Sequence, residues 1–355
     1  MIRSEEIVVF CGAGRVNRIA KKVLNSINIL RLGQKNLGLS NINFSSWPDG
    51  EPDDRIANPA KINGKHVIFF VNSHEASLVA QALQLMWAIK HQYGALSLTV
   101  VMPFMSYRRQ DHPEKSREIH RNLWFVRAMK DNRVDRLIVC DIHSDQTSKN
   151  AEDVGIKFYN VDPTPAYIES MSDLMVRLRG ESLRVLVDAP DKGSLPRAAL
   201  LAKGLELPLL VNLENFKSRL QSGDITMDNK ADEGTIALIE EIKRDYGVEV
   251  VNMAPELVKG AVIIIREDEL DTGGTAAERG RLYRDMGAVE IYMAVTHMVL
   301  SPGWRRKIAD DSPYAKIFGG NTIYRSYEKT TGGLIIDVDM SLVMGFTLNE
   351  VINQF

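Results

Sequence analysis

The chain has 355 residues, of which 45% are hydrophobic and 25% are charged, and this composition excludes an intrinsically disordered protein. The net charge of -2 gives no general attraction to nucleic acid or to an anionic membrane. Two cysteines, Cys11 and Cys140, are too few for a disulfide framework or a Cys-rich zinc site, and the apolar runs are too short to span a membrane. We therefore expect a cytoplasmic protein, and the length predicts two domains.

Short apolar runs rich in β-branched residues recur along the chain, each followed by a stretch with helical periodicity. Apolar runs without alternation are typical of strands buried on both faces, and helical connections between them predict parallel sheets. We therefore predict an α/β fold with two doubly wound domains, the first covering residues 1–148 and the second 149–335, and with residues 336–355 packing back on the first. A surface helix is expected at 228–244. The predicted strands are at 7–10, 67–70, 98–101, 137–139, 185–187, 262–265 and 289–293.

Polar clusters follow several of these strands, at the position where parallel sheets bind ligands. Residues 103–112 include Arg108 and Arg109, and arginine suits bidentate phosphate contacts, although such a segment is often only a solvated loop. Residues 141–146 include His143, which could contact a metal or a phosphate or could be a hydrogen-bonded structural histidine. The segments at 47–51 and 189–194 have the composition of ordinary turns.

The strongest local signal is residues 266–275, between the strand at 262–265 and a predicted helix. Two glycines and two threonines there allow backbone N–H groups and hydroxyls to surround phosphate oxygens. The carboxylates of Glu267 and Asp268 suit hydrogen bonds from sugar hydroxyls, so a phosphorylated ribose would account for both features. The alternative is a tight turn in which Asp271 or Thr272 caps the helix.

Taken together and in this order, five motifs resemble those of the ribose-phosphate pyrophosphokinase family. The resemblance runs from residue 11 to residue 323. It implies two phosphoribosyltransferase-like domains, Mg²⁺ and ATP as cofactor and co-substrate, and transfer of the β,γ-diphosphate of ATP to the anomeric hydroxyl of ribose 5-phosphate. It also implies a homo-oligomer built from dimers, up to a hexamer. The motifs are Pro48-Asp49-Gly50-Glu51, Tyr107-x-Arg109-Gln110-Asp111, Asp141-x-His143-x-x-Gln146, Pro190-Asp191-x-Gly193 and Asp271-Thr272-Gly273-Gly274-Thr275.

The resemblance also implies a role for each matching residue. The ATP contacts would come from Arg109, Gln110, Asp111 and Asp145, with Asp49 and Glu51 reaching across a subunit contact. The metal would be held by His143 and Asp191. Catalysis would use His143 with Lys217 and Arg219 of a loop, which would neutralise charge developing on the transferred diphosphate. The acceptor would be bound by Asp191, Glu267 and Asp268 at the ribose and by Asp271, Thr272, Gly273, Gly274 and Thr275 at the phosphate.

The sequence departs from the family pattern mainly on the acceptor side. The family's Asp-Asp pair is Glu267-Asp268 here, its Phe-Phe-Asp motif ends in Asn160, its second Gly after Pro-Asp-x is Ser194, and the region 217–260 is longer. Two alternatives therefore stay open. One is the same transfer to the distal ribose of ADP-ribose, which would place the enzyme in NAD metabolism. The other is a non-catalytic subunit that assembles with an active partner.

Overall fold

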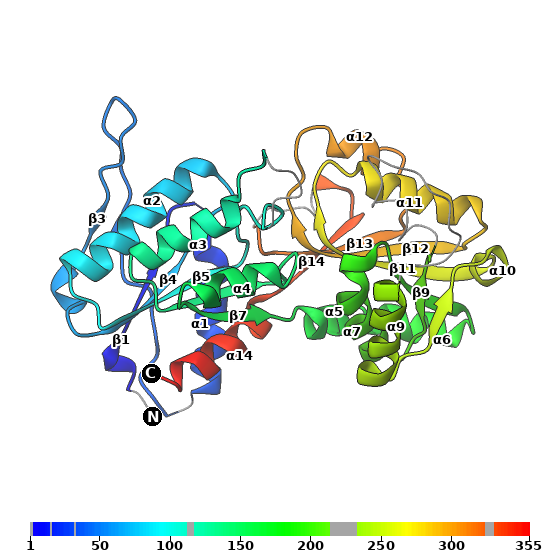
Figure 1. The fold of residues 1–355 in the computed structure, drawn as a ribbon, viewed down its shortest axis with the longest axis horizontal. Helices are drawn as coiled ribbons and strands as arrows, with labels where there is room; N and C mark the ends of the chain where they lie inside the picture. Colours follow the sequence, from blue (N-terminus) through cyan, green and yellow to red (C-terminus); the bar gives the residue numbers. More distant parts are fainter. Residues whose placement is uncertain (1–2, 15, 32, 112–116, 214–232, 324–329) are drawn as a thin grey trace. The chain divides into compact units, whose positions relative to one another are not determined.

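The computed structural model describes residues 3–14, 16–31, 33–111, 117–213, 233–323 and 330–355. They form two units, each built around its own parallel sheet (Figure 1). Unit 1 contains the described residues within 1–163, 322–324 and 339–355, and unit 2 contains those within 164–321 and 325–338. The predicted α/β class with mainly parallel sheets is confirmed.

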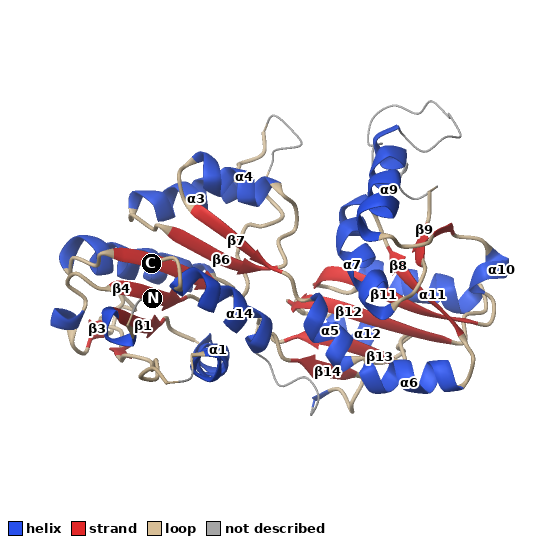
Figure 2. Cartoon of the chain, turned by 90° about the horizontal axis from the view of Figure 1, so that it is seen from below, coloured by secondary structure: helices blue, strands red, loops and turns tan. Residues whose placement is uncertain are grey.

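Unit 1 has a five-stranded parallel sheet in the order β1-β4-β5-β6-β7. Helices cover both faces of this sheet, with α1 and α14 on one face and α2, α3 and α4 on the other (Figure 2). A two-stranded antiparallel hairpin, β2 (Ile42–Asn43) with β3 (Arg55–Ile56), precedes β4. The strands are β1 (Ile7–Cys11), β4 (His66–Phe70), β5 (Ser97–Met102), β6 (Arg136–Cys140) and β7 (Lys157–Val161), and the helices are α1 (Val16–Leu30), α2 (Ala76–Trp87), α3 (Arg121–Asp131), α4 (Gln146–Asp153) and α14 (Ser341–Ile352).

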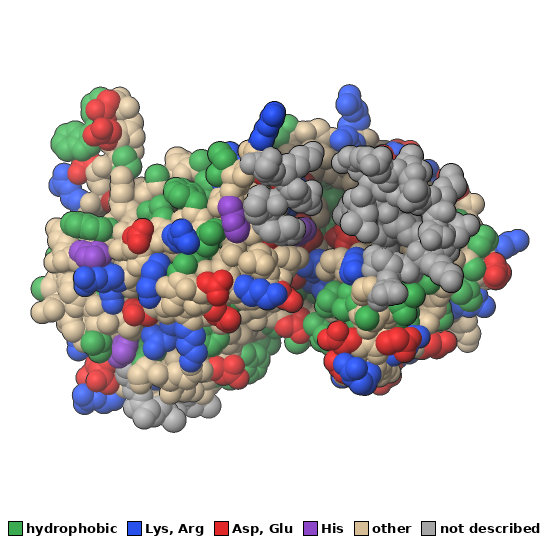
Figure 3. All heavy atoms as spheres, in the orientation of Figure 1, with side chains coloured by type: hydrophobic (Ala, Val, Ile, Leu, Met, Phe, Trp, Pro, Cys, Tyr) green, Lys and Arg blue, Asp and Glu red, His purple; other side chains and the backbone are tan. Residues whose placement is uncertain are grey.

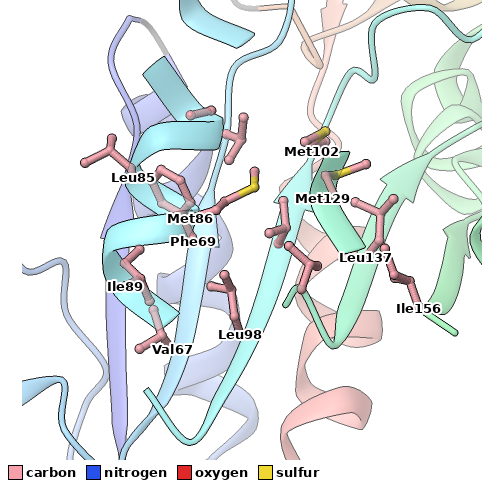
Figure 4. Packing of buried hydrophobic residues seen from close by; sticks show 14 of the residues in the cluster. Val67, Phe69, Leu85, Met86, Ile89, Leu98, Met102, Met129, Leu137 and Ile156 are labelled. Carbon is pink, nitrogen blue, oxygen red and sulfur yellow. The ribbon is translucent and has the colours of Figure 1, made fainter. Parts of the chain in front are cut away.

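The core of unit 1 explains why its strands are apolar without alternation. Phe69 of β4 lies beside Met86 of α2, and Val67 lies beside Ile89 in the turn that follows α2 (Figure 4), while the intervening Ile68 faces the other layer. All of these β4 side chains are fully buried, so both faces of the strand select apolar residues.

Unit 2 has a seven-stranded parallel sheet in the order β10-β9-β8-β11-β12-β13-β14. Helix α9 begins among the described residues at Glu233 and ends at Tyr246, and the first residues of the helix predicted at 228–244 lie outside the described part of the chain. The strands are β8 (Arg184–Ala189), β9 (Leu209–Val211), β10 (Val250–Asn252), β11 (Ala261–Leu270), β12 (Glu290–Met298), β13 (Lys316–Gly320) and β14 (Ile335–Val338), and the helices are α5 (Thr164–Ser170), α6 (Ser172–Gly180), α7 (Leu195–Leu205), α9, α10 (Pro255–Val258), α11 (Gly274–Asp285) and α12 (Trp304–Ile308).

The strand order of unit 2 reverses between β8 and β11. From β8 the chain adds β9 and β10 on one side, and from β11 it adds the remaining strands on the other. Ligands in parallel α/β sheets bind beyond the carboxyl ends of the strands at such a reversal. The ends of β8 and β11 are therefore where a ligand of unit 2 is expected.

The division of the chain differs from the predicted boundaries at both ends. Residues 149–163 belong to unit 1, because β7 pairs with β6 along its whole length. Residues 336–338 belong to unit 2 as part of β14, and the segment that lies in unit 1 begins at Asp339. There α14 packs closely on α1: a Cβ added to Gly345 would lie 2.9 Å from the Cβ of Ser26.

Candidate functional site

The turn after β8 is held by a reciprocal set of hydrogen bonds between Asp191 and Ser194. The backbone N–H of Ser194 donates to Asp191 Oδ1 at 2.9 Å, and the backbone N–H of Asp191 donates to Ser194 Oγ at 3.0 Å. The Ser194 hydroxyl in turn donates to the Asp191 carbonyl at 2.7 Å, and Ser194 is fully buried. The serine that departs from the family pattern thus fixes the backbone that carries the Asp191 carboxylate.

Replacing Ser194 with Ala should loosen Asp191 without leaving a large cavity. Loss of the two hydroxyl hydrogen bonds is expected to cost about 1–2 kcal/mol of unfolding free energy. For the reaction that the family resemblance implies, it should raise KM for the ribose phosphate acceptor more than KM for ATP. Thermal unfolding and steady-state kinetics would measure both effects. Ser172→Ala, at the first residue of α6 in the same unit, is the control. An unchanged KM for the acceptor would show that Ser194 does not position Asp191 for binding.

The predicted strand at 262–265 is longer in the structure, and β11 continues to Leu270 because its pairing with β12 goes on after the pairing with β8 has ended at Ile265. Glu267 pairs with Val295 of β12, and the pairing continues to the end of the strand. The two acids before the glycine-rich turn are therefore strand residues, and their side chains leave β11 toward opposite faces. Glu267 lines a cavity, whereas Asp268 lies 3.9 Å from the guanidinium of Arg197 on α7.

The environment of Glu267 favours its neutral form. Burial raises the pKa of Glu267 to about 8, and the nearby carboxylates of Asp268, Asp191 and Asp188 act in the same direction, whereas Arg197 opposes them. At neutral pH the side chain is therefore mostly protonated and can donate as well as accept a hydrogen bond. A perturbed carboxyl group in a cavity is a feature of binding and catalytic sites.

In the glycine-rich turn after β11, the backbone packs so closely on α12 that Gly273 has no room for a side chain. Gly273 has φ +77°, in the left-handed region, and a Cβ there would lie 2.4 Å from Cγ1 of the buried Ile308. Gly273 is also the N-cap residue of α11 and has no side chain, so the predicted alternative of a cap by Asp271 or Thr272 is not what forms this turn. Thr272 and Thr275 are exposed, and their hydroxyls are open to a ligand.

Lys307 on α12 is a residue of this region that the motifs did not indicate. Its Nζ lies 3.6 Å from the position that a Cβ of Gly274 would occupy, and the side chain is exposed. The Lys307 ammonium group thus supplies a positive charge beside the turn that was predicted to hold a phosphate. Only the run of three consecutive basic residues, Arg305-Arg306-Lys307, could have suggested it.

A cavity of about 280 Å³ lies at the reversal point of the sheet in unit 2. Asp191, Glu267, Thr275 and Arg279 line it together with apolar residues of β11, β12 and α11. The structure therefore places residues of two predicted motifs, which are separated by about 80 positions in the sequence, around one cavity. The cavity is small for a nucleotide but matches the size of a sugar phosphate.

A buried ion pair that the sequence did not reveal supports this cavity. Arg279 of α11 donates to both carboxylate oxygens of Asp188 on β8, at 3.0 Å from Nε and 2.6 Å from Nη2, and also to the hydroxyl of Tyr283 at 3.2 Å. Asp188 is fully buried and Arg279 is 8% exposed. The pair ties the helix behind the glycine-rich turn to the strand that precedes Asp191.

In unit 1, Asp49 and Glu51 lie at the tip of the hairpin between β2 and β3, which projects from the unit (Figure 1, Figure 3). Asp49 Oδ1 accepts a hydrogen bond from the backbone N–H of Glu51 at 3.0 Å, and Gly50, with φ +92°, closes the turn. The adjacent Trp47 is 55% exposed. The composition correctly predicted a turn, and within this chain the two carboxylates contact solvent.

The predicted ATP-binding residues of the second motif follow β5 but differ in exposure. Arg109 and Gln110 are exposed, whereas Asp111 is 1% exposed. The Asp111 carboxylate accepts a hydrogen bond from the hydroxyl of Ser144, which follows β6. Asp111 therefore joins two loops of the sheet edge, and its geometry favours positioning over direct contact with a ligand.

His143 and Asp145 lie in the loop between β6 and α4. Asp141, at the start of this loop, has φ +47°, a conformation that costs energy in a residue with a side chain and is concentrated at functional sites. Asn160 of β7 supports the loop, because its Oδ1 accepts a hydrogen bond from the backbone N–H of Ile142 at 3.2 Å. The acid-to-amide replacement noted in the sequence thus keeps an acceptor oxygen next to His143.

The remaining predictions concern the catalytic loop, a metal site, a membrane span and the two cysteines. Lys217 and Arg219 fall within residues 214–232, outside the described part of the chain. Among the described residues, no group of three or more His, Cys, Asp and Glu side chains is arranged to hold a metal ion. Within the same residues, none of the helices is both long and apolar enough to cross a membrane. Cys11 and Cys140 are not joined in a disulfide and are buried at the ends of β1 and β6.

Two family models match the chain. The model described as the N-terminal domain of ribose phosphate pyrophosphokinase matches residues 7–129, and the model described as a phosphoribosyl synthetase-associated domain matches residues 189–354. The first match contains β1 to α3, with the hairpin and the loop after β5. The second contains both turns that line the cavity of unit 2.

Known proteins similar to this chain align with it over most of their own length. The ribose-phosphate pyrophosphokinase of Ralstonia nicotianae is 28% identical over 313 residues, which cover 87% of this chain and 84% of that protein. That of Methanopyrus kandleri is 27% identical over 298 residues, 82% of this chain and 87% of that protein. The crystal structure of phosphoribosylpyrophosphate synthetase from Mycobacterium smegmatis matches the fold with a TM-score of 0.72 at 19% identity, covering 98% of this chain and 99% of that one.

Proposed function

Because this chain belongs to the ribose-phosphate pyrophosphokinase family, we propose that it transfers the β,γ-diphosphate of ATP to the anomeric hydroxyl of ribose 5-phosphate. In this reaction the anomeric oxygen attacks the β-phosphorus of ATP, the bond from that phosphorus to the α,β-bridging oxygen breaks, and AMP leaves. The hydroxyl proton is released. The observation that carries the proposal is the cavity of unit 2, which is lined by carboxyl groups and by a residue of the glycine-rich turn.

The acceptor is assigned to unit 2. The ribose hydroxyls would be bound by Glu267 and Asp191, which line the same cavity, while Asp268 holds Arg197 beside them. The 5-phosphate would be bound by the turn Asp271-Thr272-Gly273-Gly274-Thr275, with Lys307 contributing charge. A donor-rich turn beside an acid-rich cavity suits one ligand with both a phosphate and a sugar.

The nucleotide is assigned to unit 1. Arg109 and Gln110 would contact ATP directly, Asp111 would hold the loop through Ser144, and Asp145 would lie at the start of α4. His143 would contact the phosphates. Lys217 and Arg219, in the part of the chain that the structure does not describe, would stabilise the charge on the transferred diphosphate.

Mg²⁺ fits the residues present, because its preferred ligands are oxygen atoms and the carboxyl groups of Asp191 and Glu267 line one cavity. Glu267, which is mostly protonated at neutral pH, would release its proton if it bound the ion. Mg²⁺ is commonly held by one or two carboxylates together with substrate phosphates and water, so its binding does not depend on a preformed group of three acids. Asp191, with His143 in unit 1, is the residue that we assign to it. When bound, the ion neutralises charge on the phosphates.

The two replacements that raised the possibility of a non-catalytic subunit argue instead for an active enzyme. Ser194 holds the backbone of Asp191 through its hydroxyl, and Asn160 holds the backbone next to His143 through its amide oxygen. Each replacement makes a hydrogen bond that orders a residue needed for the reaction. Neither replacement therefore disrupts the backbone of the site, which supports an active enzyme.

A homo-oligomer is part of the proposal. Asp49 and Glu51 are presented on a projecting hairpin with the exposed Trp47, and a tip of this kind suits contact with a second copy of the chain. We assign these carboxylates to the ATP site of a neighbouring subunit. The buried thiols of Cys11 and Cys140 suit a reducing compartment such as the cytoplasm.

The choice of acceptor can be tested directly. The purified protein is supplied with ATP and Mg²⁺ and with either ribose 5-phosphate or ADP-ribose, and AMP release is followed. Ribose 5-phosphate is expected to support AMP formation at least tenfold faster. A preference for ADP-ribose would assign the reaction to that acceptor. No AMP with either acceptor, together with intact ATP binding, would contradict the proposed function and favour the non-catalytic subunit.

A further inference from the structure

A cavity of about 570 Å³ in unit 1 has no role in the function proposed above. It lies at the carboxyl end of β1, between the first turns of α1 and the segment 37–44. Its volume falls within the range of about 300–1,000 Å³ that is usual for small-molecule sites. The cavity of unit 2 discussed above is about half as large.

The position of this cavity in the sheet is that of a ligand site. After β1 the chain forms α1 and then passes beside β1, where the backbone N–H of Ser40 donates to the Val9 carbonyl at 2.7 Å and Leu39 forms a parallel bridge with Val9. The next strand of the sheet, β4, pairs with the opposite edge of β1. The winding of unit 1 therefore reverses at β1, and ligands bind beyond the carboxyl end of the strand at such a reversal.

The polar residues of the lining are donors on one stripe of α1. Asn17, Lys21 and Asn25 are spaced four residues apart, so they lie on the same face in successive turns of the helix. Ser40 and Asn41 supply a hydroxyl and an amide from the segment opposite. No carboxylate lines this cavity among the described residues, so the Lys21 ammonium is its one formal charge there.

Apolar residues also line the cavity. Leu24, Ile42 and the thiol of Cys11 line it, and burial raises the pKa of the Cys11 thiol to about 12, so this thiol stays neutral. Phe44 also lines the cavity and is 38% exposed, which leaves its ring available for contact with a ligand. The cavity thus combines one cationic, donor-rich wall with an apolar and aromatic surface.

We propose that this cavity binds a phosphomonoester that carries a planar or apolar group, such as a nucleoside monophosphate. The phosphate contacts Lys21 and the amides of Asn17 and Asn25, because an ammonium group and neutral donors complement its oxygens. The remainder of the ligand contacts Ile42 and Phe44. This site is separate from the residues assigned to ATP, which follow β5 and β6, because β4 lies between β1 and β5 in the sheet.

Methyl NMR on the full-length protein can test this site separately from the catalytic one. The δ1 methyl of Ile42 reports on the cavity, and that of Ile142, next to His143, reports on the nucleotide side of the proposed active site. The probes are AMP, adenosine and inorganic phosphate. AMP is expected to shift the Ile42 signal in a saturable way and to bind there at least tenfold more tightly than adenosine or phosphate.

Two adjacent lysines provide a matched pair of variants. Lys21→Gln should weaken the effect of AMP on Ile42 by about tenfold, since a charged hydrogen bond is lost, without changing its effect on Ile142 or the rate of AMP release from ATP. Lys22→Gln is the control, because Lys22 pairs with Asp339 at 2.6 Å and does not line the cavity.

Three results would overturn the proposal. The first is an Ile42 signal that does not respond to AMP at millimolar concentration. The second is adenosine or phosphate binding as tightly as AMP, which would show that only one part of the lining is used. The third is an equal response of the Lys21→Gln and Lys22→Gln proteins, which would show that Lys21 does not bind the phosphate.

Discussion

Arg279→Met should destabilise unit 2 by about 3–5 kcal/mol, because the substitution leaves the Asp188 carboxylate buried without its partner. The two bonds to this carboxylate are 3.0 Å and 2.6 Å long, and Asp188 is fully buried on β8. At about 2–4 °C for each kcal/mol, the unfolding midpoint of this unit would fall by roughly 6–20 °C. Differential scanning calorimetry on the full chain would measure this decrease in the unfolding midpoint.

The large loss of stability is expected only because the Asp188–Arg279 pair is buried, and two further variants test this cause. Arg177→Met makes the same substitution at a pair with Glu290, 2.6 Å apart, in which both side chains are 30–40% exposed. It should cost less than about 1 kcal/mol. Asp188→Asn combined with Arg279→Met removes both charges and should recover at least half of the loss. Equal effects of the two arginine substitutions would contradict the interpretation of Asp188–Arg279 as a buried pair that requires both members.

Gly273→Ala should lower kcat/KM for the acceptor by about 10²-fold while leaving KM for ATP within twofold. The added methyl group would meet Ile308 Cγ1 at 2.4 Å, and the backbone has φ +77°. A non-glycine residue in this conformation costs roughly 1–2 kcal/mol, and overpacking a buried site costs about 1–3 kcal/mol more. The turn is expected to relieve both by shifting, and a displacement of about 1 Å at a binding group is enough for a loss of this size. Steady-state kinetics with each substrate varied in turn measures the effect.

Gly303→Ala, in the same unit, separates the cost of a positive φ from the cost of steric overlap. Gly303 also has a positive φ, +93°, but a Cβ there would meet nothing within 4 Å. This variant should show the conformational cost as a small decrease in stability, with unchanged kinetics for the acceptor. If the folded Gly273→Ala protein used ribose 5-phosphate as well as the wild type, the turn after β11 would not be the phosphate-binding element.

The sequence predicted the buried strands well, because a strand that is buried on both faces is a continuous run of apolar residues. The runs at 7–10 and 137–139 lie inside β1 and β6, where nearly every side chain is buried. The pattern did not predict the full length of β11, because Arg266, Glu267 and Glu269 continue to pair with β12 although they are polar. Backbone pairing with β12 alone carries the strand beyond Ile265, and residue type does not indicate such pairing.

The sequence motifs identified the turns of the candidate site, but they did not predict the hydrogen bonds and the ion pair that fix those turns in place. Asp188 and Arg279 are 91 positions apart, and each alone resembles an ordinary polar residue at the end of a strand or on a helix. The role of Ser194 was equally hidden, because its hydroxyl bonds depend on the turn conformation around Asp191. The resemblance to a family compared residue types, whereas these contacts depend on which strands are neighbours.

The return of the chain to unit 1 through α14 has a consequence for biosynthesis. Helix α14 packs on α1, and the last residue, Phe355, stacks on His66 of β4 with ring centroids 4.6 Å apart. One face of the first sheet therefore gains the part of its cover that α14 supplies only after residues 339–355 have been synthesised, although domains commonly fold in the order of their synthesis. Until then unit 1 exposes apolar surface on that face, and a chain terminated before Asp339 would be a substrate for chaperones or proteases.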